Sequence, residues 1–140
     1  MNVVIDTNVW ISALISKDGV SRELIRWALL DKIVPQISTT LFLEYEDVMK
    51  REKIQTLCSL TIQEQEELFQ AFLSTCKWNE IFYLWRPNLT DEGDDFLIEL
   101  AVASNSSVII TDNVKDIECG ELKFDIEVLT PKKFMERYRK

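Results

Sequence analysis

The chain has 140 residues, of which 46% are hydrophobic and 29% are charged, a composition typical of one globular domain spanning residues 1–140. It contains no histidine, which excludes a Ser-His-Asp triad and removes the commonest zinc ligand. The net charge of −8 disfavours a nucleic-acid-binding surface, unless some of the 24 acidic residues bind a cation.

The distribution of apolar residues and cysteines bears on whether the protein is membrane-bound, secreted, disulfide-rich or zinc-binding. The apolar runs are much shorter than the roughly 20 residues that a membrane span requires, and the N-terminus lacks the basic region of a signal peptide. The three cysteines are odd in number and widely spaced: Cys58, Cys76 and Cys119. This pattern disfavours both a disulfide scaffold and a zinc site. We therefore expect a cytoplasmic protein with no membrane association.

Short apolar runs alternate with segments of helical spacing along the whole chain. The apolar runs predict strands at 3–5, 33–37, 81–85, 108–110 and 126–129. Helical spacing and capping residues predict helices at about 9–16, 21–32, 41–52, 61–76 and 93–104. Thr130 and Pro131 then begin a terminal helix in the favoured order of cap and proline. Such alternation indicates an α/β fold with a parallel sheet buried on both faces.

Polar residues directly follow two of the predicted strands. The first strand is followed by Asp6, and the strand at 108–110 is followed by Asp112, Asn113 and Asp116. Because parallel strands end at the same edge of a sheet, where ligands bind in such folds, we expect these side chains to lie close together.

An acid of the helix at 41–52 also faces inward. Glu44 has Leu41 and Val48 at the i−3 and i+4 positions, so it borders the buried stripe, whereas Asp47 points away. Glu46 lies at the opposite border of the stripe. The projection therefore favours Glu44 without excluding Glu46.

A second helix carries an acid at the start of its buried stripe. Asp94 precedes Leu97, Ile98 and Ala101 at i+3, i+4 and i+7, and Asp95 is rotated about 100° from it. A buried, unpaired charge costs several kcal/mol, and no basic residue occupies this stripe. A metal ion shared with the aspartate after the first strand would supply the missing positive charge.

Each acid also has a simpler explanation. Asp6 is suited to capping the following helix, and Asp94 to a helix N-terminus favoured by the macrodipole. Glu44 is explained equally by a solvated surface position, and Asp116 by the capping of a short turn. These explanations work one at a time, but they do not account for several acids at one edge of the sheet.

Four stretches that carry these acids resemble the PIN-domain family, in particular the group of toxin components of toxin–antitoxin pairs. The stretches are 4–9 (VIDTNV), 37–45 (ISTTLFLEY), 94–101 (DDFLIELA) and 110–117 (ITDNVKDI), followed by 129–134 (LTPKKF). They occur in the order and spacing of the family. The resemblance implies a three-layer α/β/α sandwich with a central parallel sheet of four to five strands.

The resemblance also implies a set of site residues. The catalytic and Mg²⁺- or Mn²⁺-binding residues would be Asp6, Glu44, Asp94 and Asp116. Residues behind these ligands, or alternatives to them, would be Thr7, Asn8, Asp95, Thr111, Asp112 and Asn113. Because an asparagine stands at 113 where many relatives have an aspartate, the fourth acid is either Asp112 or Asp116. Candidate contacts to RNA phosphates are Lys50, Arg51, Lys53 and Lys115, for which solvation by water is the alternative explanation.

We therefore expect a metal-dependent endoribonuclease, the toxin component of a toxin–antitoxin pair, whose antitoxin is a small protein that blocks the acidic pocket. One alternative is a catalytically silent PIN-like module that binds RNA or protein. Another is an aspartyl phosphotransferase with Asp6 as nucleophile, although such enzymes usually carry a second aspartate where this chain has Asn8. The resemblance also allows a homodimer, with Trp10, Trp27 and Trp78 either at its interface or in the core.

Overall fold

A computed structural model describes residues 1–80, 95–114 and 126–139. In chain order its elements are β1 (Asn2–Ile5), α1 (Thr7–Ile15), α2 (Val20–Leu29), β2 (Val34–Ile37), α3 (Thr39–Met49), α4 (Glu52–Leu57), α5 (Ile62–Thr75), β3 (Lys77–Trp78), α6 (Asp95–Ala103), β4 (Val108–Ile110), β5 (Glu127–Leu129) and α8 (Pro131–Tyr138). The predicted α/β alternation is confirmed. The predicted strand at 81–85 lies outside the described residues.

The strands form one parallel sheet in the order β3-β2-β1-β4-β5. Strand β1 is central, and its residues Val3, Val4 and Ile5 are fully buried. Because the sheet is parallel, the chain leaves every strand at the same edge. The residue after β1 therefore lies at the middle of that edge, between the ends of β2 and β4.

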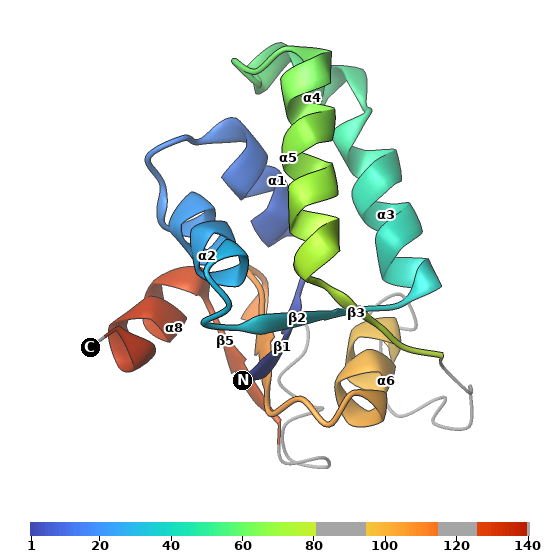
Figure 1. Cartoon of the computed structure of the whole chain (residues 1–140), viewed down its shortest axis with the longest axis vertical. Helices are drawn as coiled ribbons and strands as arrows, with labels where there is room; N and C mark the ends of the chain where they lie inside the picture. Colours follow the sequence, from blue (N-terminus) through green and yellow to red (C-terminus); the bar gives the residue numbers. More distant parts are fainter. Residues whose placement is uncertain (81–94, 115–125, 140) are drawn as a thin grey trace.

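Helices cover both faces of this sheet, as predicted for a three-layer sandwich. Figure 1 shows α1, α2, α3 and α5 on one side of the strands and α6 on the other. Helix α6 packs on β1, β2 and β4, while α8 packs beside β5 and against α2. Within the described residues, no helix is long and apolar enough to cross a membrane.

Aromatic side chains join α1, α3 and α5 into one layer. The Trp10 ring stacks on Phe72 with 5.1 Å between ring centroids, and both residues are fully buried. Tyr45 of α3 completes the cluster at 5.8 Å from Phe72. Trp10 is thus a core residue and not part of an exposed interface, whereas Trp78 is 51% exposed.

The sequence prediction was wrong in the region after α3. The helix predicted to continue to residue 52 ends at Met49, and a separate helix α4 begins at Glu52. The side-chain amide of Gln55 donates to the Met49 carbonyl at 2.7 Å and so satisfies a group at the end of α3. The two-residue strand β3 was also missed, because Lys77 and Trp78 are both exposed and form no apolar run.

Two leucines on opposite faces of α3 test the orientation of this helix. Leu41 is fully buried and Leu43 is 54% exposed. We expect Leu41→Ala to lower the free energy of unfolding by about 2–5 kcal/mol, since it leaves a cavity in the core. Leu43→Ala, the matched control, should change it by less than about 0.5 kcal/mol. Denaturant unfolding measures both values, and equal losses would contradict the placement of α3.

Candidate functional site

The ends of β1, β4 and β5 are held together by backbone hydrogen bonds that continue past the strands. The Asp6 amide donates to the Ile110 carbonyl at 2.9 Å, and the Thr111 amide donates to the Leu129 carbonyl at 2.9 Å. These bonds bring Asp6 and Thr111 side by side at the carboxyl edge of the sheet, as the sequence predicted for residues that follow neighbouring strands.

Asp6 is 9% exposed, and its carboxylate accepts hydrogen bonds on both oxygens. Its Oδ1 accepts from the Thr7 amide at 2.7 Å, which makes Asp6 the N-cap of α1. Its Oδ2 accepts from the Thr111 hydroxyl at 2.7 Å and from the Asn8 side-chain amide at 3.3 Å. The capping role considered from sequence is therefore confirmed, but it occupies one oxygen only. A carboxylate has about four lone-pair sites, so Asp6 retains the capacity for a further bond.

Thr111 and Asn8 connect Asp6 to the loop after β4. The Thr111 hydroxyl is fully buried and accepts from the Asn113 amide at 3.0 Å. The Asn8 side chain donates to this hydroxyl at 3.4 Å and accepts from the Asp112 amide at 3.2 Å. The first turn of α1 thereby fixes the position of Asp112 relative to Asp6.

Glu44 faces this network from α3. The Thr7 hydroxyl donates to Glu44 Oε1 at 2.5 Å, so the residue after Asp6 holds the Glu44 side chain. Glu44 and Glu46 are half-buried and Asp47 is exposed, as the helical projection predicted. Of the two glutamates, Glu44 is the one that lines the same cavity as Asp6.

These residues line an open cavity of about 490 Å³ at the carboxyl edge of the sheet. Its lining residues are Asp6, Thr7, Asn8, Ile11, Ser12, Glu44, Val48, Asp112 and Asn113.

The cavity disfavours the ionised form of two of its carboxylates, Asp6 and Asp112. Burial raises the pKa of Asp6, and the neighbouring charges of Glu44 and Asp112 raise it further, against the lowering effect of the Thr111 and Thr7 hydrogen bonds. Burial also raises the pKa of Asp112, although a hydrogen bond with Ser12 lowers it. Both carboxylates are therefore harder to ionise than free aspartate, and a cation beside them would offset that cost.

The donor chemistry of the cavity fits a hard divalent cation, because every polar side chain that lines it offers oxygen and none offers imidazole or thiolate. Within the described ranges, however, no three acidic or thiol side chains converge closely enough to form a metal site. The predicted ligands Asp94 and Asp116, and the predicted phosphate contact Lys115, lie outside those ranges. Asp95 is the first residue of α6.

Two of the basic residues predicted to contact phosphate, Lys50 and Arg51, lie between α3 and α4. Lys50 pairs with Glu46 at 3.8 Å, and Arg51 pairs with Asp47 at 2.9 Å. Lys50 lines a smaller cavity between α3, α4 and α5 and not the carboxylate cavity. Lys53 lies on the exposed surface of α4.

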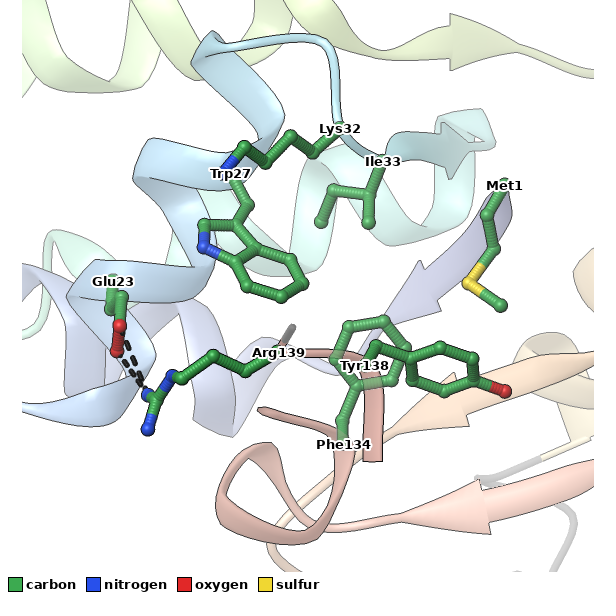
Figure 2. Close-up of a pocket in the computed structure, with 8 residues that line it drawn as sticks. All are labelled: Met1, Glu23, Trp27, Lys32, Ile33, Phe134, Tyr138 and Arg139. Atoms are coloured by element: carbon green, nitrogen blue, oxygen red, sulfur yellow. Dashed lines mark hydrogen bonds and ion pairs between the residues drawn. The ribbon is translucent and has the colours of Figure 1, made fainter. Parts of the chain in front are cut away.

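A second cavity of about 500 Å³ lies at the opposite edge of the sheet, where β1 and β2 begin (Figure 2). Its lining includes the aromatic residues Trp27, Phe134 and Tyr138. The acid that lines it, Glu23, pairs with Arg139, as the dashed lines in Figure 2 mark. Since the carboxylate that lines this cavity already pairs with an arginine, the candidate metal site is the one at the carboxyl edge.

Two hydroxyl-bearing residues at or beside the site, Ser12 and Tyr45, were not predicted from the sequence. Ser12 follows Asn8 by one helical turn, so the spacing of α1 could have placed it on the same face. Tyr45, whose hydroxyl donates to the Ile5 carbonyl at 2.5 Å, follows a catalytic candidate but has no sequence signal of its own.

The raised pKa of Asp6 predicts how a neutral replacement affects stability. The folded chain raises the pKa of Asp6 above its value in the unfolded chain, near 3.8. The protonated form of Asp6 is therefore the one that favours folding: its contribution to the free energy of unfolding is greatest below pH 3.8 and is lost as pH rises through the folded pKa. We therefore expect Asp6→Asn to stabilise the metal-free protein at pH 7 by about 0.5–2 kcal/mol, and the gain to shrink as pH falls. Asp47→Asn, at an exposed carboxylate, should change stability little.

Thermal unfolding between pH 3 and pH 8 in the presence of a chelator measures this difference. An Asp6→Asn variant that is less stable than the parent at pH 7 would show that the native hydrogen bonds outweigh the burial of charge.

Comparison with known proteins assigns the fold and the family. A chain in the crystal structure of VapBC2 from Rickettsia felis, bound to a DNA fragment from their promoter, matches with a TM-score of 0.57 and 16% sequence identity. The match covers 92% of this chain and 97% of that chain, and at this identity it concerns the fold alone. A comparison of the sequence with curated proteins finds no match. The family model described as PIN domain matches residues 2–115, and the chain therefore belongs to the PIN-domain family.

Proposed function

We propose that this chain is an endoribonuclease that depends on Mg²⁺ or Mn²⁺ and hydrolyses RNA phosphodiester bonds. The observation that carries the proposal is the buried Asp6 carboxylate, with its raised pKa, in the same open cavity as Glu44 and Asp112. A buried carboxylate with further acids beside it is costly to a fold, and functional sites are where such arrangements concentrate. Membership of the PIN-domain family supports the same conclusion.

The cation ligands in this proposal are Asp6, Glu44, Asp94 and Asp116, with Asp95 and Asp112 as alternatives. A divalent cation, when bound, would lower the pKa of a water molecule and stabilise negative charge on the phosphoryl oxygens. The surrounding side chains keep the ligands in place. Thr111 and the Thr7 amide hold the two oxygens of Asp6, and the Thr7 hydroxyl holds Glu44.

Phosphate contacts by Lys50, Arg51, Lys53 and Lys115 are part of the same proposal. Lys50 and Arg51 would have to exchange their glutamate and aspartate partners for phosphate. Both pairs are exposed, with 64% of the Lys50 side chain and 62% of the Arg51 side chain accessible. Exposed pairs of this kind contribute little free energy, so the exchange costs little.

We also propose that residues 1–140 act as one domain in the cytoplasm, as the toxin component of a toxin–antitoxin pair. The fold match to a chain of the VapBC2 structure supports this assignment. The antitoxin would be a small protein that places a cationic side chain, such as arginine, among Asp6, Glu44 and Asp112. Co-expression with the product of the adjacent gene should give a complex that survives gel filtration and does not cleave RNA; separate elution would count against such a partner. Gel filtration of the chain without a partner would test for a homodimer.

Cleavage of labelled single-stranded RNA by the purified protein tests the nuclease proposal. We expect cleavage with Mn²⁺ or Mg²⁺ and none in EDTA. Glu44→Gln and Asp6→Asn should each lower the rate by about 100-fold or more, since metal-site residues behind the ligands already contribute 10–100-fold. A DNA strand of the same sequence shows whether RNA is the preferred substrate.

Matched variants on the same helix control for indirect effects. Glu46→Gln and Asp47→Asn remove a charge from α3 outside the carboxylate cavity and free Lys50 and Arg51, so both should retain at least the parent rate. Cleavage that persists in EDTA, or in Asp6→Asn, would refute the proposed chemistry. A parent that binds RNA without cleaving it would favour a catalytically silent PIN-like binding module.

A further inference from the structure

Two consecutive residues of α3 bind the residues on either side of Asp6. The Tyr45 hydroxyl donates to the carbonyl of Ile5, at 2.5 Å, and Glu44 accepts from the hydroxyl of Thr7, at 2.5 Å. The contacts therefore bracket Asp6 along the chain, and both come from the helix that carries Glu44.

The Tyr45 side chain is buried among aromatic residues of the core. It is 1% exposed and its ring contacts Trp10, Phe69 and Phe72, at centroid distances of 6.4, 6.5 and 5.8 Å. Burial also raises the pKa of its phenol well above the ordinary value of 10.0, so the hydroxyl stays protonated and remains a donor. A phenylalanine ring would be enough to fill this part of the core. The hydroxyl of Tyr45 adds a hydrogen bond to a backbone carbonyl at the end of β1.

We propose that Tyr45 is a positioning residue, whose hydroxyl holds the end of β1 against α3 and so sets the placement of Asp6 relative to Glu44. The proposal rests on the proposed function, because it assigns Tyr45 to the site where these two carboxylates would share a cation. Without the Tyr45 hydroxyl, the hydrogen bond between Thr7 and Glu44 would still join α3 to this turn. The segment around Asp6 then opens locally more often, while the aromatic core stays packed.

Tyr45→Phe tests the proposal, because it removes one oxygen and keeps the ring. Tyr138→Phe is the matched control, since Tyr138 lies in α8 and lines the cavity at the opposite edge of the sheet. The first readout is amide hydrogen exchange, which reports local opening without any metal or substrate. Exchange of the Thr7 amide, which donates to Asp6, is compared with that of the β4 core amides in each variant.

We expect the Thr7 amide in Tyr45→Phe to exchange about tenfold faster relative to the β4 amides, and to be unchanged in Tyr138→Phe. An unchanged ratio in Tyr45→Phe would overturn the proposal. A uniform increase at all amides would also overturn it, because it would show a general loss of stability and no positioning role.

The second readout is the affinity for Mn²⁺ by titration calorimetry. We expect Tyr45→Phe to bind Mn²⁺ about tenfold more weakly than the parent, with Tyr138→Phe equal to the parent. Equal affinity in Tyr45→Phe would contradict a role in placing the two carboxylates. If the parent itself binds no Mn²⁺, the proposed metal-dependent function fails, and the hydrogen-exchange ratio alone decides whether Tyr45 holds the end of β1.

Discussion

The constraint on which the site depends is the burial of one carboxylate at the end of the central strand. Asp6 directly follows β1, which lies between β2 and β4, and it is 9% exposed to solvent. An ionised group in such a place requires donors, and the fold supplies them from Thr7, Asn8 and Thr111. Thr7 and Asn8 lie there because they follow Asp6 in the first turn of α1, and Thr111 because a parallel sheet brings the ends of β1 and β4 to one edge.

These donors do not fully offset the cost of the charge, as the raised pKa of Asp6 shows. The remaining penalty is increased by Glu44, which α3 brings to the same cavity, and by Asp112. A protein selected for stability alone would have little reason to place these acids together, because the charges of Glu44 and Asp112 make Asp6 harder to ionise. The arrangement is understandable if the stability lost in the free protein is recovered when a cation binds.

The sequence was informative wherever a local pattern coincided with the tertiary fold. The burial pattern of α3 agreed with the projection that favoured Glu44, and the polar residues after β1 and β4 met as a parallel sheet requires. Prediction failed where long-range contacts decide the structure. Nothing in residues 50–52 marks a helix break, since the break depends on Gln55 turning back to Met49 and pairing with Gln65 on α5. Likewise, the Tyr45 hydroxyl has a role only because β1 ends beside α3.

The central claim is that the cavity holding Asp6 and Glu44 is a divalent-cation site. Anomalous diffraction from crystals soaked in Mn²⁺ tests it most directly, because it locates the ion without reference to activity. The account predicts an anomalous peak within about 2.0–2.3 Å of an Asp6 carboxylate oxygen, a distance typical of hard-cation ligation. Peaks confined to exposed surface acids, with the Asp6 carboxylate still bound only to Thr7, Asn8 and Thr111, would contradict it.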